Sequence, residues 1–218
     1  MAEFYSETQR SLQDRFGTRG LANVLEERVL RKRLTERDQK FLAACDFFFL
    51  TTVDDRGYPT VSYKGGGPGF VRILDDRTLA FPVYDGNGMF LSTGNVASNA
   101  KVGLLFIDFE RPRRLRLHGE ARLLPADPMM ADYPEALFMI RVALTEIFTN
   151  CPRYIHHYKR LDVSEYVPRA GCETPVPEWK RVDYLQAQLP EKDRLKAQKA
   201  GETITEDVYR KNFWKGVD

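Results

Sequence analysis

The sequence has few cysteines and no long hydrophobic run. Its three cysteines, Cys45, Cys151 and Cys172, are too few and too scattered for a disulfide framework, and none belongs to a Cys-x-x-Cys pair. No stretch approaches the roughly 18 apolar residues of a membrane span, and the first residues lack the apolar segment of a signal peptide. We therefore expect a cytoplasmic protein with reduced thiols and no membrane association.

An excess of charge of one sign is also missing. Lys and Arg number 33 against 31 Asp and Glu, which gives a formal net charge of +2. The surface as a whole is not that of a polyanion-binding protein, so a basic site must be local and no nucleic-acid partner is expected. The adjacent His156 and His157 have no Cys, Asp or Glu at ligand spacing, and we interpret them as surface residues rather than as metal ligands.

What is present suits one domain of 218 residues with three parts. Residues 1–46 are charged and helix-forming, and Thr35 with Asp38 has the pattern of a capping box that opens a helix through Ala44. Residues 47–167 form a β-rich core. Residues 168–218 comprise an extended Pro-rich arm and two C-terminal helices between 190 and 214, with Thr203 or Thr205 as a cap.

Short strands follow one another in the β-rich core. FFFLTTV, residues 47–53, precedes a tight turn at Asp54–Gly57, and further strands are predicted from Thr60, from Gly69 and over TLAFPV. LRLHGEARLL alternates apolar and polar residues, as a half-solvated strand does. Residues 137–148 fit both helical and strand periods, and we favour a strand. Residues 150–161 predict a turn that enters a short helix with Pro152 in its first turn.

The stretch from Tyr84 to Phe109 is the most informative part of the chain. Its first half is rich in Gly, Asn, Ser and Thr, whose small side chains let backbone N–H groups and hydroxyls surround an anion. The run VGLLFIDF follows, and its apolar content predicts a strand buried on both faces. A phosphate-binding loop beside a buried strand is therefore expected. Cys151, further along the chain, is expected to be buried as a small apolar residue.

Together these segments predict a mainly β protein with flanking helices (α+β), built on an antiparallel barrel. The region from Cys45 to Leu124 resembles the pyridoxamine 5′-phosphate oxidase-like family of FMN-binding split barrels. The resemblance rests on Gly57–Pro59, on Gly86-Asn87, on the run Ser92-Thr93-Gly94-Asn95, and on NAKVGLLFIDF leading to RRLRLHG. NCPRYIH, residues 150–156, resembles a segment of the uncharacterised branch of this family.

The resemblance implies a six-stranded split barrel that forms a homodimer with FMN in clefts at the subunit interface. Residues Val61 to Lys64 occupy the strand that lines the flavin ring. The positions of the family's first arginine and final lysine hold Ser62 and Gly67, so Lys64 is the candidate for the displaced charge. Ser92 occupies a phosphate-binding lysine position, and Arg114 occupies that of a flavin-facing glutamine. The implied cofactor-binding residues are Val61, Ser62, Tyr63, Lys64, Tyr84, Asn87, Ser92, Thr93, Asn95, Arg114 and Arg116.

These features favour an FMN-dependent oxidoreductase that uses flavin N5 for hydride transfer with a small-molecule substrate, and with NADH or NADPH as candidate donors. The oxidase's C-terminal substrate-binding signature is missing, which argues against pyridoxamine phosphate as the substrate. No side chain of this sequence is assigned a catalytic role. The alternative is a non-catalytic flavin-binding or flavin-sensing protein. Less favoured are an oligonucleotide-binding barrel with RPRRLRLHGEAR as its basic strand, and a haem-binding split barrel.

Overall fold

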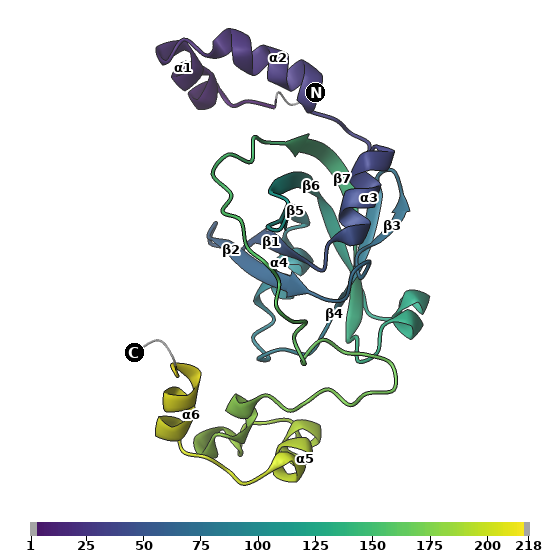
Figure 1. Ribbon diagram of the computed structural model, residues 1–218, viewed down its shortest axis with the longest axis vertical. Helices are drawn as coiled ribbons and strands as arrows, with labels where there is room; N and C mark the ends of the chain where they lie inside the picture. The colour runs from purple at the N-terminus through teal and green to yellow at the C-terminus, as the bar shows by residue number, and fades with distance from the viewer. Residues whose placement is uncertain (1–3, 216–218) are drawn as a thin grey trace. The chain divides into compact units, whose positions relative to one another are not determined.

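The computed structural model describes residues 4–215, and the chain in it forms two compact units that meet between Asp162 and Val163. The first unit holds a seven-stranded antiparallel sheet with four helices (Figure 1). The strands are β1 (Phe47–Val53), β2 (Pro59–Gly65), β3 (Arg72–Asp75), β4 (Thr78–Val83), β5 (Lys101–Asp108), β6 (Arg113–Leu124) and β7 (Phe138–Thr149). No described helix is long and apolar enough to cross a membrane.

The sheet is strongly curved but not closed. Its strand order is β2-β1-β5-β6-β7-β4-β3, so that β2 and β3 are the two edges. This confirms the prediction of a mainly β split barrel with flanking helices. The sheet has seven strands, one more than the six that the resemblance implies, and the segment after Gly69 contributes the four-residue edge strand β3, which pairs with β4.

Alternation along the strands separates a core face from an outer face. In β1, Phe48, Leu50 and Thr52 are fully buried while their neighbours are half-buried, because successive side chains point to opposite faces. Phe48 stacks on Phe106 and meets Phe81 edge-on, which ties three strands together in the core. β5 alternates in the same way, so the prediction that it is buried on both faces was wrong.

Within the described residues, the first unit has three helices before its first strand and further helices between its strands. In α3 (Glu36–Ala44), the Thr35 hydroxyl accepts a hydrogen bond from the Asp38 N–H, while the Asp38 carboxylate accepts one from the Thr35 N–H. The predicted capping box is thereby confirmed. The first unit also contains α1 (Glu7–Arg15), α2 (Arg19–Val29), α4 (Leu91–Ser98) and the 3₁₀ helix η1 (Pro128–Asp132).

Two local predictions were wrong. The Gly- and Asn-rich loop contains the helix α4, which packs against β1, β2 and β6 and gains there the stability that its small side chains lack. The predicted short helix after Pro152 does not form. Instead, the Tyr158 N–H donates to the Phe109 carbonyl oxygen and the Arg160 N–H donates to the Glu110 carboxylate, so these amides bond to the barrel and not to a helical turn.

The second unit contains the predicted C-terminal helices, α5 (Glu191–Ala200) and α6 (Glu206–Phe213), after the 3₁₀ helices η2 (Glu178–Arg181) and η3 (Asp183–Leu185). The Thr205 hydroxyl caps α6 by accepting a hydrogen bond from the Val208 N–H, as one of the two predicted caps. The buried Lys180 ammonium lies 3.1 Å from the Asp193 carboxylate, which joins η2 to α5.

Candidate functional site

A lysine and two serines meet between the edge strand β2 and the helix α4. The Lys64 ammonium donates a hydrogen bond of 3.0 Å to the Ser92 hydroxyl, and the Ser62 hydroxyl lies 3.3 Å from the same oxygen. Ser92 is buried, whereas Ser62 and Lys64 are half-buried. Three of the residues predicted to bind the cofactor are therefore brought together, although Ser92 is 28 positions from Lys64 and 30 from Ser62 in the sequence.

The local structure explains why these side chains converge. Ser62 and Lys64 are two residues apart on β2 and so point to the same face of the sheet. Ser92 stands in the first turn of α4, where backbone N–H groups have no partner within the helix and the helix dipole is positive. Phe90, immediately before α4, has a φ of 49°, a left-handed conformation that turns the chain into the helix.

The electrostatics of this cluster favour an anion. Burial lowers the pKa of Lys64 from its ordinary value, because a desolvated ammonium has lost favourable contact with water. Among residues 4–215 its hydrogen-bond partner is the neutral Ser92, and no carboxylate forms an ion pair with it. A phosphate dianion at this point would supply the missing negative charge and would accept hydrogen bonds from all three side chains.

Thr93 and Asn95 contribute less directly. The Thr93 hydroxyl donates to the Phe90 carbonyl oxygen at 3.1 Å, and the Asn95 amide donates to the Thr52 hydroxyl at 3.0 Å. Both bonds fix α4 in place, one to its own start and one to β1. Thr52, which is fully buried, was not among the predicted residues. Its place inside a strand of alternating burial gives no sign that its hydroxyl would meet α4.

Val61 and Tyr63 lie on the other face of β2. They are 64% and 63% exposed. Across the sheet, Tyr63 of β2 is aligned with Phe49 of β1, which is aligned in turn with Leu105 of β5 and then with Arg116 of β6. Arg116 and Arg114 thus share the outer face with Val61 and Tyr63. The predicted site residues therefore divide between two faces of the sheet, and Arg114 and Arg116 do not contact the Lys64–Ser92 pair.

The two arginines contact the segment that follows β7. The Arg114 guanidinium donates to the Cys151 carbonyl oxygen at 3.0 Å, and the Arg116 guanidinium donates to the Asn150 side chain at 2.7 Å. Burial, and then repulsion from Arg114, lower the pKa of Arg116. Cys151 itself is exposed, so its predicted burial was wrong: it follows the last strand, where no second layer covers it.

Tyr84 and Asn87 stand in the loop between β4 and α4. Tyr84 is half-buried, and burial, together with Tyr133, raises the pKa of its hydroxyl to about 12. Asn87 is exposed, and its side-chain oxygen accepts a hydrogen bond from the Met89 N–H at 3.1 Å. Within residues 4–215 no hydrogen bond joins either residue to the Lys64–Ser92 pair, so their cofactor role stays a prediction.

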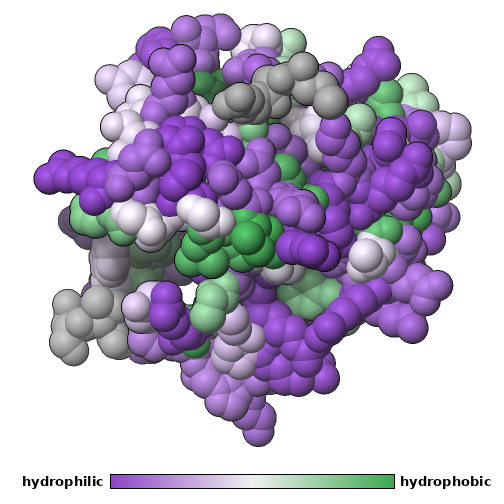
Figure 2. Space-filling view, turned by 90° about the horizontal axis from the view of Figure 1, so that it is seen from above, coloured by the Kyte–Doolittle hydropathy of each residue, from purple (hydrophilic) through white to green (hydrophobic). Residues whose placement is uncertain are grey.

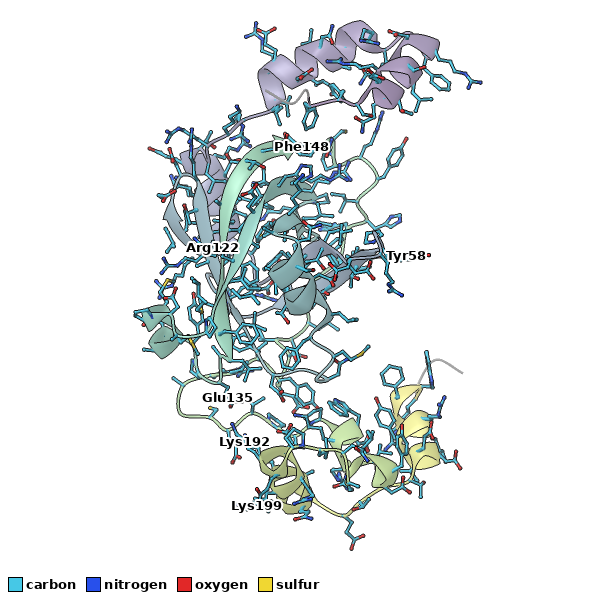
Figure 3. The ribbon with its side chains drawn as sticks, turned by 180° about the vertical axis from the view of Figure 1, so that it is seen from behind. Tyr58, Arg122, Glu135, Phe148, Lys192 and Lys199 are labelled. Atoms are coloured by element: carbon cyan, nitrogen blue, oxygen red, sulfur yellow. The ribbon has the colours of Figure 1, made fainter. Side chains whose placement is uncertain are left out.

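Sequence reasoning missed a polar pair beside Arg116. His118 Nδ1 lies 2.7 Å from the Glu146 carboxylate, and the two residues are aligned on β6 and β7. The alternating pattern of β6 gives no sign of this pair, because Glu146 is 28 positions away in the sequence. Figure 3 labels Phe148, which is aligned with Arg116 and lies edge-on to the His118 ring at 5.3 Å between centroids.

Comparison with known proteins gives one family match. The sequence profile described as pyridoxamine 5′-phosphate oxidase matches residues 34–146, just over half of the chain. No curated protein matches the sequence.

Three solved structures with folds similar to that of this chain come from bacteria. HupZ from Group A Streptococcus is 20% identical, covering 53% of this chain and 94% of its own, with a TM-score of 0.44. An FMN-binding protein from Syntrophomonas wolfei is 13% identical, covering 65% of this chain and 96% of its own, with a TM-score of 0.39. The haem storage protein HutZ from Vibrio cholerae is 18% identical, covering 54% of this chain and 94% of its own, also with a TM-score of 0.39. These scores are too low to carry a functional argument.

Proposed function

Since the chain belongs to the pyridoxamine 5′-phosphate oxidase family, we propose that it binds FMN and acts as an FMN-dependent oxidoreductase on a small molecule. The observation that carries this proposal is the desolvated Lys64 beside the Ser92 and Ser62 hydroxyls at the start of α4. These residues suit the terminal phosphate of the cofactor. When bound, the flavin supplies hydride transfer at N5.

In this proposal the protein's own residues bind the cofactor phosphate and hold one another in position around it. Lys64 neutralises the phosphate, the Ser92 and Ser62 hydroxyls donate to its oxygens, and Asn95 holds α4 to β1 so that Ser92 stays in position. The family resemblance implies that the flavin ring would lie along β2, the strand that carries Ser62 and Lys64. No side chain of the cluster is assigned a proton transfer.

The first test of the proposal is FMN binding to the purified protein. Lys64→Gln is expected to weaken FMN binding about tenfold or more, because a charge-assisted hydrogen bond to the phosphate is lost. Lys101→Gln, which removes an exposed lysine at the start of β5, is the matched control and should bind as the wild type does. The measurement is quenching of flavin fluorescence during titration with FMN. Wild-type protein that fails to bind FMN would contradict the proposal.

Turnover separates an oxidoreductase from a flavin-binding protein without activity. We expect NADH or NADPH to bleach the absorbance of bound FMN, and an electron acceptor to restore it over repeated cycles. Flavin that binds but is not reduced by either donor would support the binding-only alternative instead.

We also propose that the protein is a homodimer with FMN at the subunit interface. The outer face of β1, β2 and β5 carries an apolar surface in which Phe47 stacks on Tyr63 and on Phe109, at 5.3 and 5.9 Å between centroids. Val61 on the same face is 64% exposed. Large exposed apolar surfaces of this kind are covered in many proteins by a partner, and a second copy of the chain is the proposed one here.

Light scattering with size-exclusion chromatography tests the dimer. Val61→Asp is expected to shift the protein to a monomer because it places a charge in the proposed interface. Leu74→Asp introduces the same charge on the edge strand β3, at a residue that is 41% exposed, and should leave the dimer intact. A monomeric wild type would argue against the shared flavin cleft.

A further inference from the structure

A cavity of about 620 Å³ lies between the N-terminal helices and the outer face of β6 and β7. Its volume is within the range of small-molecule sites. One wall is formed by residues before 31, which the family profile does not reach. The lining residues are Phe4, Tyr5, Gln9, Leu25, Glu26, Val29, Leu30, Arg116, His118, Glu146, Phe148, Thr149 and Asn150.

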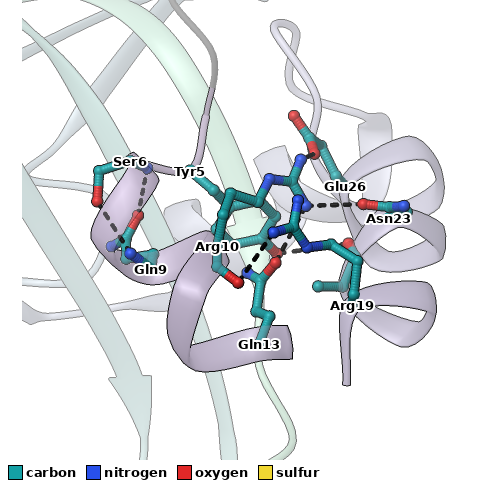
Figure 4. A network of polar contacts seen from close by, with 9 residues as sticks. Tyr5, Ser6, Gln9, Arg10, Gln13, Arg19, Asn23 and Glu26 are labelled. Atoms are coloured by element: carbon teal, nitrogen blue, oxygen red, sulfur yellow. Dashed lines mark hydrogen bonds and ion pairs between the residues drawn. The ribbon is translucent and has the colours of Figure 1, made fainter. Parts of the chain in front are cut away.

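The helical wall is built as a stable unit. The Arg10 guanidinium of α1 donates to Glu26 and to Asn23 of α2, each at 2.7 Å, and also lies over the Tyr5 ring at 4.6 Å (Figure 4). The Arg19 guanidinium reaches back to the Arg10 carbonyl oxygen at 3.0 Å. α1 and α2 are thus cross-linked by polar contacts, and these contacts hold the wall without filling the cavity.

The hairpin of α1 and α2 is attached to the sheet at both ends of this wall. After α2, Arg31 and Ile147 of β7 exchange two backbone hydrogen bonds, at 2.9 and 2.8 Å. Before α1, Phe4 meets Phe148 edge-on with 5.5 Å between centroids. Two specific contacts therefore hold the helical wall against the sheet, beside a cavity that is open to solvent.

Among the described residues, no carboxylate forms an ion pair with Arg116, the one arginine that lines the cavity. Both lining carboxylates are already hydrogen-bonded, Glu146 to His118 and Glu26 to Arg10, each at 2.7 Å. Arg116 is hydrogen-bonded to the neutral Asn150, and in the described part of the chain it forms no ion pair. Burial and the nearby Arg114 make its charge costly, as its lowered pKa indicates. An anionic group would relieve both effects.

The remaining wall is apolar. Leu25, Val29 and Leu30 of the α2 region face Phe148 across the cavity, with Phe4 beside them. Leu25 is still 45% exposed, and α2 buries only Ala22, so the hairpin gains little from packing on the sheet. Figure 2 shows the mainly hydrophilic surface of the molecule seen from above, with hydrophobic residues gathered in small clusters.

We propose that this cavity binds a small amphipathic anion, with a carboxylate on Arg116 and an apolar body between α2 and Phe148. The proposal goes beyond FMN binding and does not require it, because Arg116 and the Lys64–Ser92 pair lie on opposite faces of the sheet. The chemical class is a monocarboxylate with an alkyl or aromatic body.

Isothermal titration calorimetry with octanoate tests the site in the full-length protein. Octanoate is expected to bind, while 1-octanol, which lacks the charge, and acetate, which lacks the chain, bind at least tenfold more weakly. Arg116→Gln should weaken octanoate about tenfold or more, and Arg116→Lys should retain part of the affinity. Arg122→Gln is the matched control, on the same strand six residues away (Figure 3).

A second pair of variants tests the apolar wall. Leu25→Ser should weaken octanoate several-fold because apolar contact is lost, whereas Leu21→Ser changes an exposed leucine of α2 that does not line the cavity and should have no effect. Far-ultraviolet circular dichroism verifies that each variant is folded.

The proposal is overturned if octanoate does not bind at millimolar concentration, if octanol binds as tightly, or if Arg116→Gln binds octanoate as the wild type does. Displacement of octanoate by saturating FMN would also overturn it, since the cavity would then be part of the flavin site. A protein that binds octanoate but not FMN would support this site while contradicting the proposed flavin function, so the two failures are distinguishable.

Discussion

Cys45 and Cys151 are both free thiols, but the fold gives them opposite surroundings. Cys45 is buried at the end of α3, and burial, with Asp108 and Asp46, raises the pKa of its thiol to about 12. Cys151 and Cys172 are exposed. Since the thiolate is the reactive form, we expect iodoacetamide at pH 8 to label Cys151 and Cys172 in the native protein and to label Cys45 only after unfolding. Peptide mass mapping measures this, and native labelling of Cys45 would contradict the buried environment.

Gly119 illustrates a position where the backbone approaches too closely for a side chain. It follows a register shift between β6 and β7, and a Cβ there would lie 2.5 Å from the Ala143 carbonyl oxygen and 2.7 Å from Val142 Cγ1. Gly119→Ala is expected to lower the free energy of unfolding by about 1–3 kcal/mol.

Urea denaturation measures that loss, with Gly103→Ala as the matched control. A Cβ at Gly103 of β5 would lie 3.7 Å from Thr51 Cβ, an ordinary contact, so this variant should be much closer to wild type in stability. Equal losses in the two variants would show that the close contact at Gly119 is relieved by small shifts.

At the residue level the sequence identified part of the candidate site. The family resemblance implied both Lys64 and Ser92 as cofactor-binding residues, and the structure brings the two within hydrogen-bond distance. The His118–Glu146 pair could not be predicted, since it depends on the β6–β7 register and on the shift after His118. The division of the predicted site residues between the two faces of the sheet depends on the register in which β2, β1, β5 and β6 pair, which the sequence does not reveal.

Among the elements, α3 has the clearest local origin. Burial of Asp38 would by itself raise the pKa of its carboxyl, but hydrogen bonds from Arg31 and Thr35 outweigh this, and the pKa is lowered. A lowered carboxyl pKa contributes stability that is fully present above the unfolded value of about 3.9, and is lost as the pH falls through the folded value.

Asp38→Asn is therefore expected to cost about 1–3 kcal/mol of unfolding free energy at pH 7, and the difference from wild type should shrink below about pH 4. Chemical denaturation at a series of pH values measures it. Glu36→Gln, in the same helical turn but exposed, serves as the control and should show a much smaller change. A difference that is constant from pH 7 to pH 2 would refute the titration argument.

Prediction of the elements succeeded where local signals agree with tertiary structure. The capping box at Thr35 and the alternation in β1 and β6 are strong signals in a few adjacent residues. α4 was missed because its Gly, Ser and Asn content favours a loop, and its helical state depends on packing against β1 and β6. The helix predicted after Pro152 failed for the converse reason, because distant barrel groups take its amide hydrogens.

At the scale of the whole molecule, the two compact units are joined by a long irregular segment. Residues 150–177 contain no helix or strand. Its first part is tied to the barrel through Arg160, which forms an ion pair with Asp46. Arg169, by contrast, is exposed, and its side chain forms no hydrogen bond or ion pair among residues 4–215. Limited trypsin digestion is expected to cut first after Arg169.

Mass spectrometry of the early fragments measures the site of this cut. The arginines of β6 should resist cleavage at the same trypsin concentration, because their backbone is paired on both sides. Early cleavage within β6, with Arg169 intact, would contradict the expectation.

The edge strand β2 has a further consequence for how copies of the chain can associate. Its outer side has no strand beside it, yet it begins with Pro59, which has no N–H to donate, and it runs into three glycines and Pro68. Prolines at such positions hinder the addition of a foreign strand. The sheet is thus guarded against growing edge to edge into aggregates, and contact through its broad side is the route left open for orderly self-association.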